Sequence, residues 1–160
     1  MKRLVLLVSL SLVFVACAAD SYHDRGKWTF NEYEEWTSEP TPEIWKSEPV
    51  WTLVLLNRKG EILRSLTVRF TDQEADSCIA GKWLKAEIIA ERPERSSSFL
   101  GKPAYYVTGS YLELDLSANL CDSYYPLRGH LTIIGLSGMH GHEGMFGGEI
   151  LGRFYGTPTY

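Results

Sequence analysis

The sequence holds little of what nucleic-acid binding or helical folds require. Its 16 Lys and Arg residues are outnumbered by 20 acidic residues, and it contains only three cysteines and three methionines. Nucleic acid and anionic lipid are bound by basic stripes, and the chain has none. It also lacks a glycine-rich phosphate loop followed by a helix, and no long amphipathic helical pattern occurs. Nucleic-acid partners and helical bundles are therefore excluded.

Long apolar runs are also absent, apart from one at the N-terminus. Lys2 and Arg3 precede an apolar segment over residues 4–15, and small residues follow it. Positive charge, a short apolar core and small residues in that order are typical of a secretory signal peptide. We expect residues 1–17 to be a signal peptide with a lipobox-like end, which makes the protein an exported one.

The end of this segment resembles the lipobox of bacterial lipoproteins. The matching residues are Phe14-Val15-Ala16-Cys17, although the family usually has leucine where this chain has Phe14. The resemblance implies that Cys17 is lipidated and becomes the first residue. Ala18, in place of a retention-signalling aspartate, implies the outer membrane, facing the periplasm or the surface. The alternative is cleavage after Ala18, which would give a soluble periplasmic or secreted protein.

The other two cysteines, Cys78 and Cys121, remain in the mature chain under either alternative. In an oxidising compartment they are expected to form a disulfide bond. The bond would stabilise the fold by about 3–4 kcal/mol through the entropy of loop closure. The alternative is a pair of reduced, buried thiols.

Residues 18–49 form an acidic arm or linker that is rich in tryptophan and proline. Eight acidic residues accompany three basic ones there, and a nine-residue repeat places Trp36 and Trp45 in equivalent positions. Together with Trp28, these tryptophans either pack against the folded domain or grip a partner, because aromatic residues are enriched in interface hot spots. We favour packing, since exposed tryptophans are costly in water.

Residues 50–160 show β-strand patterns separated by turn sequences. Strands are expected at residues 50–56, 61–70, 82–90, 103–108, 111–117, 127–135 and 149–155. Turns are expected at residues 57–60 and at Gly109-Ser110. About seven to eight strands with short turns predict one small all-β antiparallel barrel or a sandwich. We favour the barrel, because closure removes exposed strand edges.

Two short motifs resemble barrel proteins. Gly26-Lys27-Trp28 and Gly81-Lys82-Trp83 resemble the Gly-x-Trp opening of lipocalins. Residues 152–156 resemble closing strands of surface lipoproteins such as transferrin-binding proteins. Both resemblances are consistent with a small lipocalin-like barrel, and neither specifies a family.

One segment has the composition of a metal site. His140 and His142 alternate between Met139 and Met145, and Glu143 adjoins them. Alternate residues of an extended segment share a face, so the two imidazoles would hold zinc or copper with Glu143 as a further ligand. If Ser137-Gly138 forms a hairpin turn, a third ligand requires this segment to leave the sheet. The alternative is a glycine-rich loop with solvated histidines.

No catalytic set emerges. Ser137 lacks the strand-to-helix setting of a nucleophile elbow, and Glu113 and Asp115 are predicted to lie on a solvated strand face. We therefore predict a non-catalytic envelope lipoprotein that binds an envelope protein or a small ligand, touching the membrane only through its anchor. The alternative is a periplasmic metal-binding protein.

Overall fold

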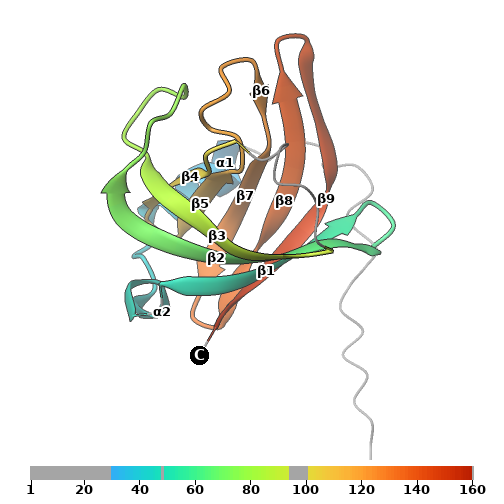
Figure 1. Ribbon diagram of the computed structural model, residues 1–160. Coiled ribbons are helices and arrows are strands. Elements are labelled where there is room, and N and C mark those ends of the chain that lie inside the picture. Colours follow the sequence, from blue (N-terminus) through green and yellow to red (C-terminus); the bar gives the residue numbers. More distant parts are fainter. Residues whose placement is uncertain (1–29, 48, 94–100, 160) are drawn as a thin grey trace, which may run out of the picture.

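The computed structural model describes residues 30–47, 49–93 and 101–159. These residues form two short helices and nine antiparallel strands (Figure 1). The helices are α1 (Phe30–Ser38) and α2 (Glu43–Ser47). The strands are β1 (Val50–Asn57), β2 (Ile62–Glu74), β3 (Leu84–Arg92), β4 (Ala104–Thr108), β5 (Tyr111–Asp115), β6 (Ser123–Tyr124), β7 (Pro126–Thr132), β8 (Gly135–Gly144) and β9 (Gly147–Pro158).

Eight of the strands close into a barrel. The strand order is β8-β7-β5-β4-β3-β2-β1-β9, and β8 also pairs with β9, so the first and last strands meet. The short strand β6 lies outside the barrel wall and pairs with the end of β8. The predicted antiparallel barrel is therefore confirmed, with one more wall strand than the seven segments expected from the sequence.

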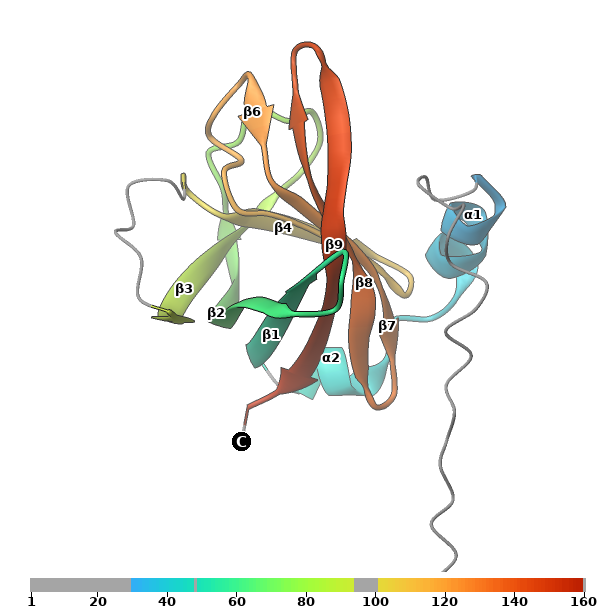
Figure 2. The ribbon, with the colours of Figure 1, turned by 90° about the vertical axis from the view of Figure 1, so that its right-hand side faces the viewer.

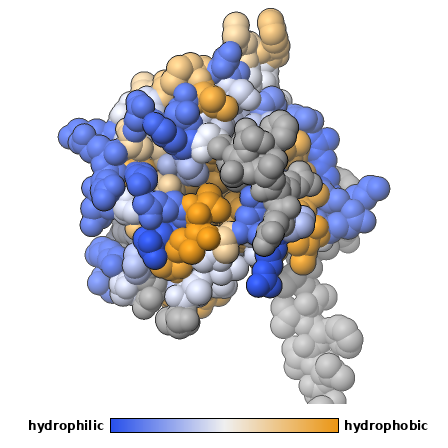
Figure 3. All heavy atoms as spheres, in the orientation of Figure 1, coloured by the Kyte–Doolittle hydropathy of each residue, from blue (hydrophilic) through white to orange (hydrophobic). Residues whose placement is uncertain are grey.

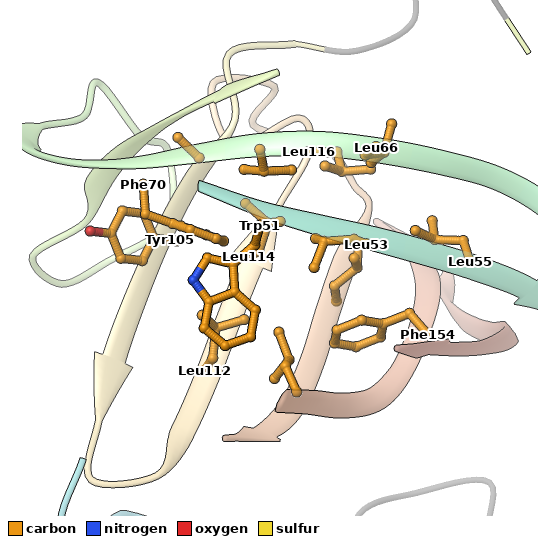
Figure 4. Close-up of a cluster of buried hydrophobic side chains, with 14 of the residues drawn as sticks. Trp51, Leu53, Leu55, Leu66, Phe70, Tyr105, Leu112, Leu114, Leu116 and Phe154 are labelled. Atoms are coloured by element: carbon orange, nitrogen blue, oxygen red, sulfur yellow. The ribbon is translucent and has the colours of Figure 1, made fainter. Parts of the chain in front are cut away.

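The barrel interior is filled with side chains. Along β1, Trp51, Leu53 and Leu55 point inward and are buried, while the residues between them are partly exposed. Phe154 of the neighbouring strand β9 pairs with Leu55, and the leucines of β5 belong to the same buried cluster (Figure 4). Alternation of this kind is what a closed sheet imposes on each strand. The interior is thus a packed core.

Polar residues occupy the interior at the end where β1 and β3 finish. Arg64 pairs with the inward-facing Leu55, and Glu91 pairs with the inward-facing Leu66. The Arg64 Nε and the Glu91 Oε1 are 2.9 Å apart. His140, opposite Leu127, donates from Nε2 to the Leu56 carbonyl at 2.8 Å. This end of the core is therefore held by ionic and hydrogen-bonding contacts.

The helices cover the barrel at two places. Trp45 of α2 packs on Trp51, Phe70 and Tyr105, which closes the end of the barrel where β1 begins. Helix α1 lies against the outer wall, as the view in Figure 2 shows. Among the described residues, neither helix has the length and apolar character needed to span a membrane.

The Cys78–Cys121 disulfide is confirmed, with an S–S distance of 2.00 Å. It joins the connection before β3 to the connection after β5. The Cys78 N–H also donates to the Ala118 carbonyl at 2.8 Å, so the two connections are fastened by more than the sulfur bridge. The disulfide lies beside the groove described below, where Ala75 and Asp76 form part of the lining.

The structure differs from two arrangements that the sequence allowed for residues 135–144, a turn at Ser137-Gly138 and a glycine-rich loop. Ser137 and Gly138 do not form a turn, because both lie within β8, and the turn falls at Ile133-Ile134 instead. The histidines do not lie in a glycine-rich loop. Glycine at position 138 allows β8 to approach β7 closely, since a Cβ on Gly138 would come within 2.6 Å of the Gly129 Cα on β7.

The expectation that Glu113 and Asp115 face solvent is wrong. Both point outward from β5 but are buried. Glu113 accepts hydrogen bonds from Tyr111 and Arg128, each at 3.0 Å. Asp115 accepts from the N–H groups of Ser117 and Tyr125. The outer face of β5 is covered by other segments of the chain, and the alternating pattern of β5 itself does not indicate this cover.

Candidate binding site at the barrel seam

The barrel wall is weakest between β3 and β4. Only two residue pairs join these strands, Leu84 with Tyr105 and Lys85 with Ala104. In contrast, β2 and β3 are joined along nearly the whole length of β3. Beyond Ala86, the edge of β3 that faces β4 has no partner strand among the described residues. This edge is the most open part of the barrel wall.

Backbone groups of β3 face this opening. The Ala86 N–H donates to the Pro103 carbonyl at 3.1 Å, so the backbone groups of Ala86 point toward the β4 side. Alternate residues of a strand direct their backbone groups to the same edge. The N–H and C=O of Ile88, two residues further on, therefore face the opening as well. They offer one donor and one acceptor to an extended chain.

A groove of about 1050 Å³ runs along this edge. Its floor is apolar, with Ala86 and Ile88 directed toward the core and Ile89 half-exposed. The bulge at Ile89, where β3 slips by one residue against β2, widens the strand at this point. We call this feature the seam groove; its lining consists of residues 74–76, 85–92 and 101–103.

Charged side chains border the seam groove, and several of them form ion pairs. Lys85 lies 2.8 Å from Glu87, and this hydrogen bond lowers the pKa of the Glu87 carboxyl. Glu91 is paired with Arg64, and Lys102 lies 3.9 Å from Asp76. On the face where β2 and β3 cross the front of the barrel, an apolar patch is bordered by hydrophilic side chains (Figure 3). The groove thus combines an apolar floor with a rim of both charges.

The structure separates the three residues proposed as metal ligands. The imidazole of His140 is bonded to the Leu56 carbonyl, whereas His142 Nε2 lies 3.1 Å from the Ser123 hydroxyl. Glu143 is held by Arg128, which lowers the pKa of its carboxyl. Within the described ranges, no group of three or more His, Cys, Asp or Glu residues is arranged to hold a metal ion. The metal hypothesis gains no support from this geometry.

Two of the three tryptophans pack against the barrel. The indole ring of Trp36 stacks on the His130 ring, with centroids 4.9 Å apart and nearly parallel planes. Trp45 lies among the aromatic residues at the end of the core, as described above. Both contacts agree with the packing alternative. Trp28 and the predicted lipidation site Cys17 lie outside the described residues.

A carboxylate fastens α1 to the wall. Glu39 lies just beyond α1 and accepts a hydrogen bond from the Ser110 hydroxyl, and its Oε2 is 2.8 Å from His130 Nε2. These hydrogen bonds lower the pKa of the Glu39 carboxyl. Here the carboxylate bridges the hydroxyl and the imidazole, whereas in a catalytic triad the imidazole is the bridge. Ser110 is also fully buried, so the arrangement is a clasp.

The outer wall next to this clasp contains a partly buried ionic network. Arg128 bridges Glu113 and Glu143. Burial acts to lower the pKa of Arg128, but its hydrogen bonds to the two carboxylates outweigh burial and raise it. Burial, followed by the charge of Glu113, raises the pKa of Tyr111 well above its usual range. The network keeps β5, β7 and β8 in a fixed arrangement and leaves the seam groove as the open site.

Sequence reasoning missed the seam groove altogether. A strand was expected at residues 82–90 and the structure has β3 at residues 84–92, but the sequence pattern does not show which edge of the strand lacks a neighbour. The one available indication is the length of the connection over residues 91–102, since a tight hairpin would have paired β3 and β4 along their full length.

Comparison with protein families, with curated proteins and with solved structures finds no match for this chain.

Proposed function

We propose that the protein is a non-catalytic, lipid-anchored β-barrel of the cell envelope that binds an extended segment of a partner protein in the seam groove. The observation that carries this proposal is the edge of β3 beyond Ala86, which has no partner strand among the residues that the structure describes. The Ile88 N–H and C=O face the seam groove. An extended segment of a partner that adds to the sheet as a further strand would form hydrogen bonds with both groups.

The filled interior favours a surface site. Trp51, Leu53 and Phe154 are fully buried in the centre of the barrel, where a lipocalin-like protein would hold its small ligand. The seam groove offers the backbone N–H and C=O of Ile88 and an apolar floor at Ala86 and Ile88. An extended peptide with apolar residues at alternate positions fits that combination.

Charge narrows the class of partner further. Because the rim carries charges of both signs and several of them form ion pairs, the groove presents no strong field of one sign. A highly charged peptide would gain little there. We expect a segment of low net charge, with the affinity coming from backbone hydrogen bonds and apolar contacts.

Peptide binding tests the groove. A soluble peptide of alternating valine and threonine is titrated against the full chain, and a matched peptide carrying proline at every second position serves as the control. Ile88→Pro removes the N–H that faces the groove, so it should abolish binding, whereas Ile88→Val should retain it. Equal binding of both peptides, or undiminished binding by a folded Ile88→Pro variant, would reject strand addition.

Mass spectrometry of the mature protein tests the anchor separately. A diacylglycerol-modified Cys17 at the N-terminus is expected, and a Cys17→Ala variant should leave the membrane fraction. A chain that begins with an unmodified Ala19 would show that the protein is a soluble exported one. That result would leave the groove proposal standing.

A further inference from the structure

The hairpin of β8 and β9 ends in an apolar tip. Gly144 pairs with Gly147, so Met145 and Phe146 form a two-residue turn at its end. Phe146 is fully exposed, and Met145 is 76% exposed. The hairpin rises beyond the rest of the barrel in both views (Figures 1 and 2). Two large apolar side chains are thus held in the most prominent position of the molecule.

The tip can leave water without burying a lone charge. Its neighbours Gly144, Gly147 and Gly148 have no side chains. The nearest acidic residues in the chain are Glu143, which is paired with Arg128, and Glu149, which lies 3.5 Å from Arg58. Glu143 and Glu149 are therefore compensated, and the exposed Asp122, whose carbonyl lies beside Gly144 at the base of the tip, stays in water when only Met145 and Phe146 enter an apolar medium.

The size and shape of the tip indicate what it contacts. Two such side chains offer on the order of 300–400 Å², about half of what one partner contributes to a stable protein interface. The surface is also convex, so a protein partner would need a preformed pocket. A fluid bilayer interface adapts to a protruding tip and accepts phenylalanine and methionine at the level of the head groups.

We propose that Met145 and Phe146 insert into the interfacial region of a lipid bilayer and so orient the barrel on the membrane. The sequence predicts membrane contact only through the anchor at Cys17, and the tip is a second contact. The inference does not depend on the seam groove. Since the chain lacks a basic stripe, insertion relies on apolar burial and requires no anionic lipid.

The other end of β8 provides a matched control. Ile133 and Ile134 form the turn before β8, and each is 82% exposed. That turn lies at the end of the barrel that also carries α2 (Figure 1), with the exposed charges of Glu43 and Lys46. A barrel resting on its β8–β9 tip would hold this turn in water.

Site-specific fluorescence on vesicles tests the inference. Full-length protein with Met145→Cys or Ile133→Cys is labelled with a nitrobenzoxadiazole dye and incorporated into neutral phosphatidylcholine vesicles. The unsubstituted protein, treated in the same way, measures any background from Cys17. Quenching by aqueous iodide and by lipid-linked nitroxide then reports the depth of each label.

The label at position 145 should lose iodide quenching several-fold and become quenched by the lipid nitroxide, while the label at 133 stays accessible to iodide. Adding Phe146→Ser to the Met145→Cys protein should return the label to water. The inference is overturned if the two labels are equally accessible to iodide. It is also overturned if the label at 145 is shielded only after soluble envelope proteins are added, since the tip would then fit a protein pocket.

Discussion

Gly138 shows how a strand can be built from residues that favour turns. On the inner face of β8 it lies directly opposite Gly129, and a Cβ would collide with the backbone of β7. A hairpin turn at Ser137-Gly138 was one arrangement that the sequence allowed, since Ser-Gly is a common turn sequence. The close approach of two backbones is a tertiary constraint that local sequence does not express.

Replacing this glycine tests that explanation. Gly138→Ala should lower the free energy of unfolding by about 2–3 kcal/mol, since β7 and β8 must separate to admit the methyl group. Gly144→Ala in the same strand should change it by less than about 0.5 kcal/mol, because its Cβ would meet no atom closer than 3.4 Å. Urea unfolding of both variants provides the measurement. Equal losses would show that strand propensity, and not backbone contact, sets the cost.

His140 is expected to make the free energy of unfolding depend on pH. Burial, reinforced by the nearby charge of Arg64, lowers the pKa of its imidazole below the ordinary value of 6.5. The unfolded chain therefore takes up a proton at a higher pH than the folded protein. Stability is fully present above pH 6.5 and falls with pH until the lowered folded pKa is reached.

The free energy of unfolding should therefore fall as the pH is lowered below 6.5. His140→Gln should flatten this part of the stability profile, whereas His142→Gln should leave it unchanged. Chemical unfolding at a series of pH values measures both. If His140→Gln retains the slope of the parent protein, the buried imidazole is not its source.

At the scale of elements, the two short helices differ in what they hold. Helix α2 places Trp45 against three aromatic residues at the end of the core, whereas α1 places Trp36 on the outer wall against His130. The equivalent positions of the two tryptophans in a nine-residue repeat therefore do not imply equivalent roles.

Alanine substitutions separate those roles. Trp45→Ala should cost about 3 kcal/mol because it leaves a cavity at the end of the core, and Trp45→Phe should recover part of the loss. Trp36→Ala should cost only about 1 kcal/mol. Both variants should still bind the valine–threonine peptide. A Trp45→Ala protein with parental stability and lost peptide binding would instead support the partner-gripping alternative.

The strands that could be predicted were those whose contacts are local. Residues 111–115 alternate strictly, and Gly109 adopts a φ of 61° in the expected turn before them. Strand β8 was not predicted, because its glycines are required by the close approach of neighbouring strands and not by a local pattern. The burial of Glu113 and Asp115 was not predicted either, since their cover comes from segments such as Tyr33 of α1, whose ring lies 4.9 Å from that of Tyr111.

For the whole molecule, the disulfide and the barrel closure followed from the sequence, whereas the candidate site did not. The pairing of Cys78 with Cys121 needed only the number of cysteines and an oxidising compartment. The seam groove needed the knowledge that β3 meets β4 through only two pairs. Such a gap in a barrel wall depends on how far two strands diverge, which composition and periodicity do not describe.

Amide exchange at β3 tests the central claim most directly. In the free protein, the Ile88 N–H faces the seam groove, while the N–H of Glu87 faces the β2 ladder, so Ile88 should exchange much faster. Adding the valine–threonine peptide should slow exchange at Ile88 and leave Glu87 unchanged. If Ile88 is as protected as Glu87 without peptide and stays unchanged when peptide is added, the edge of β3 is not a site for strand addition.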